Sequence, residues 1–511
     1  MDPNLLYTRL DPSKKQIRLL QITTTSPRIS CRLSTSSLND DTAFCALTYV
    51  WGDPMNQREV WVNDTRVSVT NNLVEALTDV QEVSRGQGVP ELRLWVDAIC
   101  INQSDDIEKN HQVPLMKDIY SAAAMTFSFL GSSPSTSDLC SALDCFSVIA
   151  SRLENGDYST KQGNDSIILK LFEDLPLDPA KSELPHPEVP EIGIALPSWN
   201  SQLTEYASLL KSLAYWKRAW IFQELVLSRK TILFYKDRCI EFENFAKISE
   251  WASNISAGPK PSIIHPLTWY FILSLAYRAV RVTRLVRNVL YQYRTQTSDR
   301  KRNTPTIRQL GHYAMHLQAT NPKDYVYALL GISGLEIVPR YETTVAVASV
   351  YVEFCAKQME HNYSDPLKFL NKSGLANGNP GHHNLPSWVP NLPIGGTEKD
   401  FAMIKSFSDL DTVQTWSEFT GHSDKTFIQN HSLFLSSLLI DSVDDVSEPR
   451  PSYGDKRSLL EYVLSIFKML DRAFQDSKDS FCNDCHPFLK LTSAFYQTRI
   501  TSSDWDGASV L

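Results

Sequence analysis

Short apolar runs alternate with helical patterns over residues 15–235 of the chain. Each run is rich in branched or aromatic residues and stops at polar or turn-forming residues, which is typical of buried strands. The Ser/Thr-rich stretch that ends at Ser37 lacks such a run and is predicted to be a connection. The predicted strands cover residues 17–22, 44–51, 92–101 and 125–130.

A hairpin and two helices are predicted between these strands. Asn63-Asp64 separates two alternating segments, residues 59–62 and 66–69, as in a tight β-hairpin. A helix is predicted from residue 70 or 71 to 80. A second starts at the capping-box spacing of Asp105 and Glu108 and reaches residue 120. Pro114 lies inside the second helix, so we expect a kink or a local break there.

The order of strands and helices predicts an α/β domain over residues 15–235, with a mostly parallel sheet flanked by helices. Six prolines between residues 176 and 197 interrupt the pattern and predict an insertion at about 155–200. Beyond residue 235 apolar positions recur at helical spacing, so residues 236–511 are predicted to be mainly α-helical.

The segment from residue 217 to 234 joins a predicted apolar helix to a short apolar strand. Glu224 is a lone carboxylate within this helix, one turn after Trp220. Burial beside an indole raises the pKa of a carboxyl group, and such groups are enriched at functional sites. Glu224 could instead form an ordinary ion pair with Arg218. The spacing alone favours the ion pair.

Composition narrows the classes of function. The chain has 511 residues, 42% hydrophobic and 21% charged, with a net charge of −8. An acidic chain is a poor general nucleic-acid binder, because phosphate contacts need a basic surface. No apolar run approaches the roughly 20 residues that span a bilayer. The start of the chain lacks the features of a secretory signal, and its nine cysteines follow no framework, which together predict a cytoplasmic protein with reduced thiols.

No metal site is predicted. Cys482, Cys485 and His486 lack the second ligand pair that zinc requires. His312 and His316 share a helical face without the glutamate of a zinc protease.

Several ordered blocks resemble the fungal heterokaryon incompatibility (HET) domain. They cover residues 15–235, with a thinner resemblance over residues 305–392. Pro114 departs from the family pattern, and such chains commonly continue beyond the length at which Leu511 ends this one, which would make it a shorter or truncated variant. The resemblance implies intracellular non-self recognition that triggers cell death, as in innate immunity, with an allelic protein or a second copy as partner. The blocks are ALTYVWGDP at 46–54, LWVDAICINQSDDIEKNHQVPLMKDIYSAA at 94–123, FLG at 129–131, RAWIFQELVLS at 218–228, ATNPKDYVYALLGI at 319–332 and LPSWVPNL at 385–392.

Residues 220–225, WIFQEL, are also similar to the WxxxEL element of Toll/interleukin-1 receptor (TIR) domains. This resemblance implies a TIR-like fold in which Glu224 cleaves NAD between nicotinamide and ribose. NAD would be the substrate, with no further cofactor. A carboxylate can stabilise the oxocarbenium-like state of that reaction, and aromatic rings can stack on the substrate. The residues expected to bind substrate are Trp51, Gly52, Asp53, Asp97 and Trp220.

Structural roles compete with these assignments. Asp97 would equally serve as a buried hydrogen-bonded anchor, and Trp51 and Trp220 as core residues. A non-enzymatic signalling module that self-associates or recruits partners is the alternative to an enzyme. A metal-dependent hydrolase is a third alternative, but helix capping and solvation explain its acidic residues more simply. These residues are Asp97, Asp105, Asp106 and Glu108.

Overall fold

The computed structural model describes residues 6–131, 136–156, 165–178, 199–256 and 317–361, with a few shorter pieces up to residue 434. The chain divides into two compact units, residues 1–395 and 396–511. The described part of the second unit is a hairpin of β10 (Phe427–Gln429) and β11 (Ser432–Phe434). All other elements among the described residues belong to the first unit.

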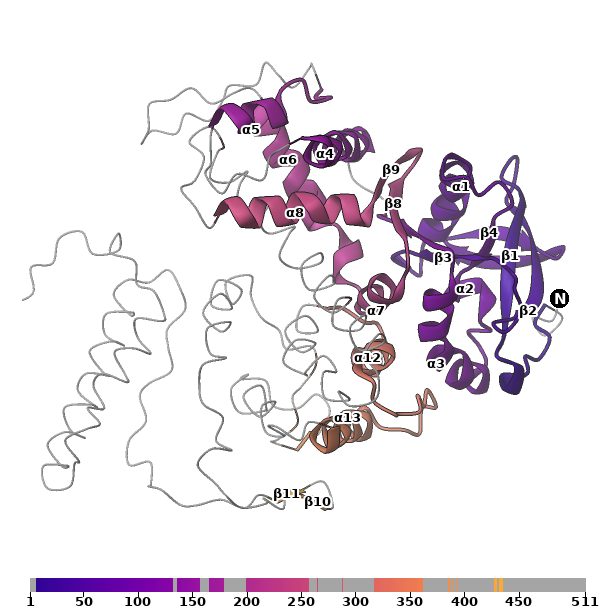
Figure 1. The fold of residues 1–511 in the computed structure, drawn as a ribbon. Helices are drawn as coiled ribbons and strands as arrows, with labels where there is room; N and C mark the ends of the chain where they lie inside the picture. The colour runs from indigo at the N-terminus through magenta and orange to yellow at the C-terminus, as the bar shows by residue number, and fades with distance from the viewer. Residues whose placement is uncertain are drawn as a thin grey trace, which may run out of the picture. The chain divides into compact units, whose positions relative to one another are not determined.

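A nine-stranded sheet is the frame of the first unit (Figure 1). Its order is β5-β4-β2-β1-β6-β3-β7-β8-β9. Four neighbouring pairs are parallel and four antiparallel, so the predicted mostly parallel sheet is wrong and the sheet is mixed. The strands are β1 (Gln16–Thr24), β2 (Ser30–Ser37), β3 (Cys45–Thr48), β4 (Gln57–Val62), β5 (Thr65–Thr70), β6 (Arg93–Trp95), β7 (Met125–Phe129), β8 (Thr231–Tyr235) and β9 (Arg238–Glu241).

The parallel core is β6-β3-β7-β8. From β3 the chain runs through the β4–β5 hairpin and α1 (Asn71–Gly86) to β6 on one side of β3. It then crosses through α2 (Asp97–Cys100) and α3 (Asp106–Ala122) to β7 on the other side. Right-handed crossovers in opposite directions place α1 and α3 on opposite faces of the sheet. Figure 1 shows α1 on one side of the strands and the α2–α3 pair on the other.

Two predicted elements are wrong for a common reason. The stretch predicted as a connection up to Ser37 contains β2, whose Cys31 and Leu33 are buried at alternate positions. The strand predicted over residues 92–101 is the three-residue β6 followed by one helical turn, α2. In both places burial is set by the neighbouring layers of the sheet and not by the local residue pattern.

Other predictions are confirmed. The hairpin turns at Asn63 and Asp64, whose φ angles of 47° and 62° lie in the left-handed region that such turns require. The Asp105 carboxylate caps α3 by accepting the backbone N–H groups of Ile107 and Glu108 at 2.9 and 3.1 Å. One expectation for α3 is wrong: the helix is continuous through Pro114, so of the kink or local break expected there, the break does not occur.

A group of helices adjoins the β9 edge of the sheet. Within it α4 contacts α5, α6, α8 and β9. Within the predicted insertion, residues 157–164 and 179–198 lie outside the described residues. The histidines and cysteines that were considered as metal ligands also lie outside them. The helices are α4 (Thr136–Asn155), α5 (Asp165–Phe172), α6 (Trp199–Ser212) and α8 (Phe242–Ser256).

Downstream of residue 236, most of the predicted helical region also lies outside the described residues. Its described helices are α8, α12 (Asp324–Ser333) and α13 (Val347–His361). In the described part of the chain, no helix is both long enough and apolar enough to span a bilayer.

Candidate functional site

The carboxyl ends of β3 and β6 lie side by side, because the two strands are parallel neighbours. Residues 49–53 follow β3, and Asp97 comes two residues after the end of β6. The chain leaves β3 first toward β6 and later reaches β7 on the opposite side, so the sheet has a topological switch point at β3. Open α/β sheets bind ligands at the carboxyl ends of strands beside such a point.

Helix α7 (Ala219–Leu227) brings Glu224 to this place. All nine of its residues are buried, as its apolar sequence predicts. The Glu224 side chain is fully buried, and Thr48 at the end of β3 donates a hydrogen bond to its Oε2 atom. The other oxygen, Oε1, has no well-formed hydrogen bond from the described residues, although the Tyr120 hydroxyl is a further hydrogen-bond partner of the carboxyl group. Its nearest cation is Arg218, with Nη1 at 3.7 Å.

Arg218 connects the two strand ends. Its guanidinium donates to the Tyr49 carbonyl at 2.7 Å and to Asp97 Oδ2 at 2.9 Å. The same Asp97 oxygen accepts the Trp51 indole N–H at 2.9 Å. The guanidinium carbon lies 6.0 and 5.9 Å from the ring centres of Tyr49 and Trp51. We call these five residues, Arg218, Glu224, Asp97, Tyr49 and Trp51, the Arg218 cluster.

The electrostatics of the cluster follow from burial. Burial raises the pKa of Glu224 to about 7, against the opposing effect of Arg218. Burial also raises the pKa of Tyr49 well above its usual value. Burial lowers the pKa of Arg218, but Glu224 and Asp97 outweigh it, so the net change is upward and the guanidinium stays charged. A carboxyl group with a pKa near 7 can hold or release a proton at neutral pH.

The residues expected at the site are only partly brought together. Trp51, Asp97 and Glu224 belong to the cluster, whereas Gly52 and Asp53 lie in the exposed turn after Trp51. Gly52 has a φ of +80°, and a Cβ there would approach Asn72 Nδ2 to 2.8 Å. The Asp53 carboxylate accepts the Met55 backbone N–H, which is a turn contact.

Trp220 is buried and hydrogen-bonded to Asp324 of α12. Trp220 therefore packs in the interior, which is the structural role given above as the alternative to substrate binding. Sequence reasoning named Arg218 only as an ion-pair partner and missed Thr48, Tyr49 and Asp324. The sequence signal that could have identified them was the resemblance to the HET family. Thr48 and Tyr49 fall within the block at 46–54, and Asp324 falls within the block at 319–332.

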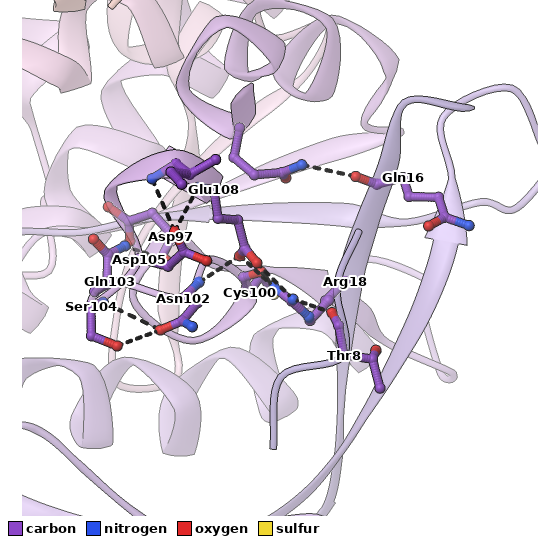
Figure 2. A network of polar contacts seen from close by, with 12 residues as sticks. Thr8, Gln16, Arg18, Asp97, Cys100, Asn102, Gln103, Ser104, Asp105 and Glu108 are labelled. Carbon is purple, nitrogen blue, oxygen red and sulfur yellow. Dashed lines mark hydrogen bonds and ion pairs between the residues drawn. The ribbon is translucent and has the colours of Figure 1, made fainter. Parts of the chain in front are cut away.

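A second polar network supports the loop after α2 (Figure 2). Gln103 donates through Nε2 to the Asp97 carbonyl at 2.8 Å. Glu108 accepts the Asn102 backbone N–H at 2.7 Å and both terminal nitrogens of Arg18, at 2.6 and 2.9 Å. Arg18 also donates to the Cys100 carbonyl at 3.0 Å. The network thus fixes the backbone from Asp97 to Asn102.

The carboxylates considered for a metal site have other partners. Asp97 is bound to Arg218 and Trp51, Asp105 caps α3, and Glu108 pairs with Arg18. Asp106 lies 2.6 Å from Lys109. Nowhere in the described part of the chain do three or more metal-ligating side chains gather.

Comparison with known proteins bears on this region of the chain. Residues 44–224 match the family model described as heterokaryon incompatibility protein (HET). The chain carries a HET domain. The matched segment begins beside β3 and ends at Glu224, so it contains all five residues of the Arg218 cluster.

A curated relative extends the likeness beyond the HET domain. Heterokaryon incompatibility protein 6, OR allele, of Neurospora crassa is 26% identical over 416 residues. The match covers 74% of this chain and 58% of the relative, so the chain spans little more than half of the relative's length. No solved structure matches the chain.

Residues 317–342, downstream of the HET domain, pack against it. The Gln318 backbone bonds on both sides of Arg218, accepting the Ala219 N–H at 2.9 Å and donating to the Lys217 carbonyl. Helix α12 contacts both α3 and α7. The Gly331 backbone N–H donates to Gln223 Oε1 at 2.7 Å, and Asn110 of α3 donates to Glu342 at 2.8 Å. The segment thus holds the helix that carries Glu224.

Gly331→Ala is expected to lower the free energy of unfolding by about 1–3 kcal/mol, the usual effect of overpacking a tight contact. A Cβ at this position would overlap Gln223 Oε1 and lie 2.9 Å from Lys117 Cβ. Urea unfolding of both proteins measures the change. Gly86→Ala is the matched control, since a Cβ there meets nothing within 4 Å. Equal stability of the two variants would contradict the tight α7–α12 contact.

Proposed function

We propose that this chain acts in heterokaryon incompatibility and that its HET domain hydrolyses NAD at Glu224. The first half of the proposal is supported by the HET domain and by the name of the Neurospora crassa relative. The second half rests on one observation: a fully buried carboxyl group with a pKa of about 7 at the carboxyl ends of parallel strands. The strand order β6-β3-β7-β8, a flavodoxin-like arrangement, supports a TIR-like role for this position.

The reaction would break the bond between nicotinamide and ribose. Nicotinamide leaves with the electron pair of that bond, and the ribose passes through an oxocarbenium-like state that a carboxylate stabilises. Water then adds to the ribose carbon and gives up a proton, which Glu224 can accept. Trp51, whose side chain is 40% exposed, offers a ring at the mouth of the cluster for the substrate to stack upon.

The test compares NAD consumption by the purified full chain and by Glu224→Gln, at low and high protein concentration. We expect the wild type to consume NAD and the variant to lose at least about 100-fold in rate, the usual effect of removing a catalytic group. Circular dichroism confirms that the variant is folded. Glu59→Gln, which changes an exposed carboxylate, is the control and should keep the wild-type rate.

A non-enzymatic interaction module is the second candidate, because Glu224 has no exposed surface in this structure. Trp51 and Met55 are exposed apolar side chains on the turn beside the cluster, and they would contribute to a contact with an allelic protein or a second copy. Growth arrest by both the wild type and Glu224→Gln, with no loss of NAD in either case, would establish this candidate and exclude the enzyme.

We place either activity in the cytoplasm. The described residues contain seven free cysteines, five of them buried, which suits a reducing compartment.

A further inference from the structure

We infer that the Arg218 cluster is a binding site for a planar organic cation, and that Arg218 fills this site as an internal plug. Two carboxylates, Asp97 and Glu224, and two aromatic rings, Tyr49 and Trp51, surround one planar cation. Planar cations are attracted to aromatic faces and to carboxylates, and burial strengthens both interactions. A ligand of the same shape and charge would make the same contacts.

The contact between Arg218 and Glu224 differs from that of a structural ion pair elsewhere in the first unit. Arg18 and Glu108 form a bidentate pair at 2.6 and 2.9 Å, with Glu108 also accepting a backbone N–H. Arg218 approaches Glu224 only to 3.7 Å, and the hydrogen-bond partners of Glu224 are two neutral hydroxyl groups, those of Thr48 and Tyr120. A buried carboxylate that lacks a direct hydrogen bond from a cation is costly. Arg218 therefore satisfies Asp97 and the Tyr49 carbonyl but leaves Glu224 without a closely paired cation.

The position of Arg218 along the chain allows it to move. It precedes α7 with extended backbone angles, φ −72° and ψ 129°, so its side chain can turn without unwinding the helix. Trp51 is the most exposed member of the cluster, which gives the direction of exit. The backbone on both sides of Arg218 is held by Gln318. A shift of residues 317–342 would therefore withdraw the plug, and this couples the site to the segment beyond the HET domain.

The inference deepens the proposed function, because the nicotinamide ring of NAD is a planar cation. Arg218 would then keep the site closed until the downstream segment moves. The binding test below involves no turnover. A chain that binds the probe but leaves NAD intact would overturn NAD hydrolysis and leave the cation site standing.

The probe is 1-methylnicotinamide, a planar cation without the bond to be hydrolysed, and neutral nicotinamide is its control. We expect Arg218→Ala to bind 1-methylnicotinamide at least about tenfold more tightly than the wild type, as measured by calorimetry. Adding Glu224→Gln to Arg218→Ala should remove most of this gain. Nicotinamide should bind more weakly throughout.

Arg18→Ala is the matched control, because it also empties a buried arginine site, one with a single carboxylate, Glu108, and a single aromatic ring, Tyr7. Guanidinium should bind to both alanine variants, whereas 1-methylnicotinamide should bind more tightly to Arg218→Ala, where two carboxylates and two rings surround the site. Equal binding of 1-methylnicotinamide to the two variants, or no gain over the wild type, overturns the inference. If Arg218→Ala fails to fold, Arg218→Gln decides, because it removes the positive charge but keeps a polar side chain in the site. The same affinity in Arg218→Gln and the wild type then overturns the inference.

Discussion

Arg18→Ala is expected to lower the free energy of unfolding by about 3–5 kcal/mol, because it leaves the Glu108 carboxylate buried without its partner. The Arg18 side chain is 2% exposed and that of Glu108 10%, so water cannot replace the lost contacts. The change also frees the Cys100 and Thr8 carbonyls, which accept from Arg18 at 3.0 and 2.6 Å. Urea unfolding at neutral pH measures the loss.

Two further variants separate the effect of burial on stability from the effect of charge. Arg238→Ala removes an exposed arginine that pairs with Asp144 and Asp237, and it should change stability little. The double variant Arg18→Met/Glu108→Leu removes both buried charges and should recover most of the loss. If Arg18→Ala and Arg238→Ala were equally stable, the network in Figure 2 would contribute nothing to the fold.

The wild type is expected to lose about 3 kcal/mol of stability relative to Glu224→Gln as the pH rises from about 4.5 to 7.5. Folding raises the pKa of Glu224 from 4.5 to about 7 through burial, so the folded chain holds this proton more tightly than the unfolded chain. The resulting stabilisation is complete below about pH 4.5 and is lost as the pH passes through about 7. Each tenfold change in proton affinity corresponds to about 1.4 kcal/mol.

Urea unfolding of both proteins between pH 4.5 and 8 measures this difference directly. Asp79 and Asp324 also have pKa values raised by burial, but they are present in both proteins and cancel in the comparison. Glu59→Gln, at an exposed position, should follow the wild type at every pH. Parallel curves for the wild type and Glu224→Gln would show that the Glu224 carboxyl is not desolvated.

Local sequence signals predicted an element correctly where its structure depends on its own residues. The turn at Asn63 and Asp64 and the cap at Asp105 were predicted, because each depends on backbone preferences within a few residues. Strand β2, which contains Cys31 and Leu33, was not predicted, because the strand is defined by its pairing with β1 and β4 and not by its own residues. The mixed character of the sheet likewise depends on pairings between strands that no local pattern encodes.

In the candidate site, too, the features that were predicted depend on residues close in sequence, and those that were missed depend on distant ones. Glu224 stood out as a lone carboxylate in an apolar helix, and the structure buries it fully, which raises its pKa. Its ion pair with Arg218 was also foreseen, because the two residues are close in sequence. The contact of Arg218 with Asp97 spans 121 residues, and that of Arg18 with Glu108 spans 90. Contacts at such separations come from the topology of the sheet.

The packing of residues 317–342 on α3 and α7 has a consequence for the exchange of segments between related chains. Each contact pairs a residue of the HET domain with one downstream: Gln223 with Gly331, Trp220 with Asp324, and Asn110 with Glu342. A crossover between residues 224 and 317 separates all three pairs at once. Functional recombinants should therefore inherit the two segments from the same parent, even though about ninety residues lie between them in the gene product.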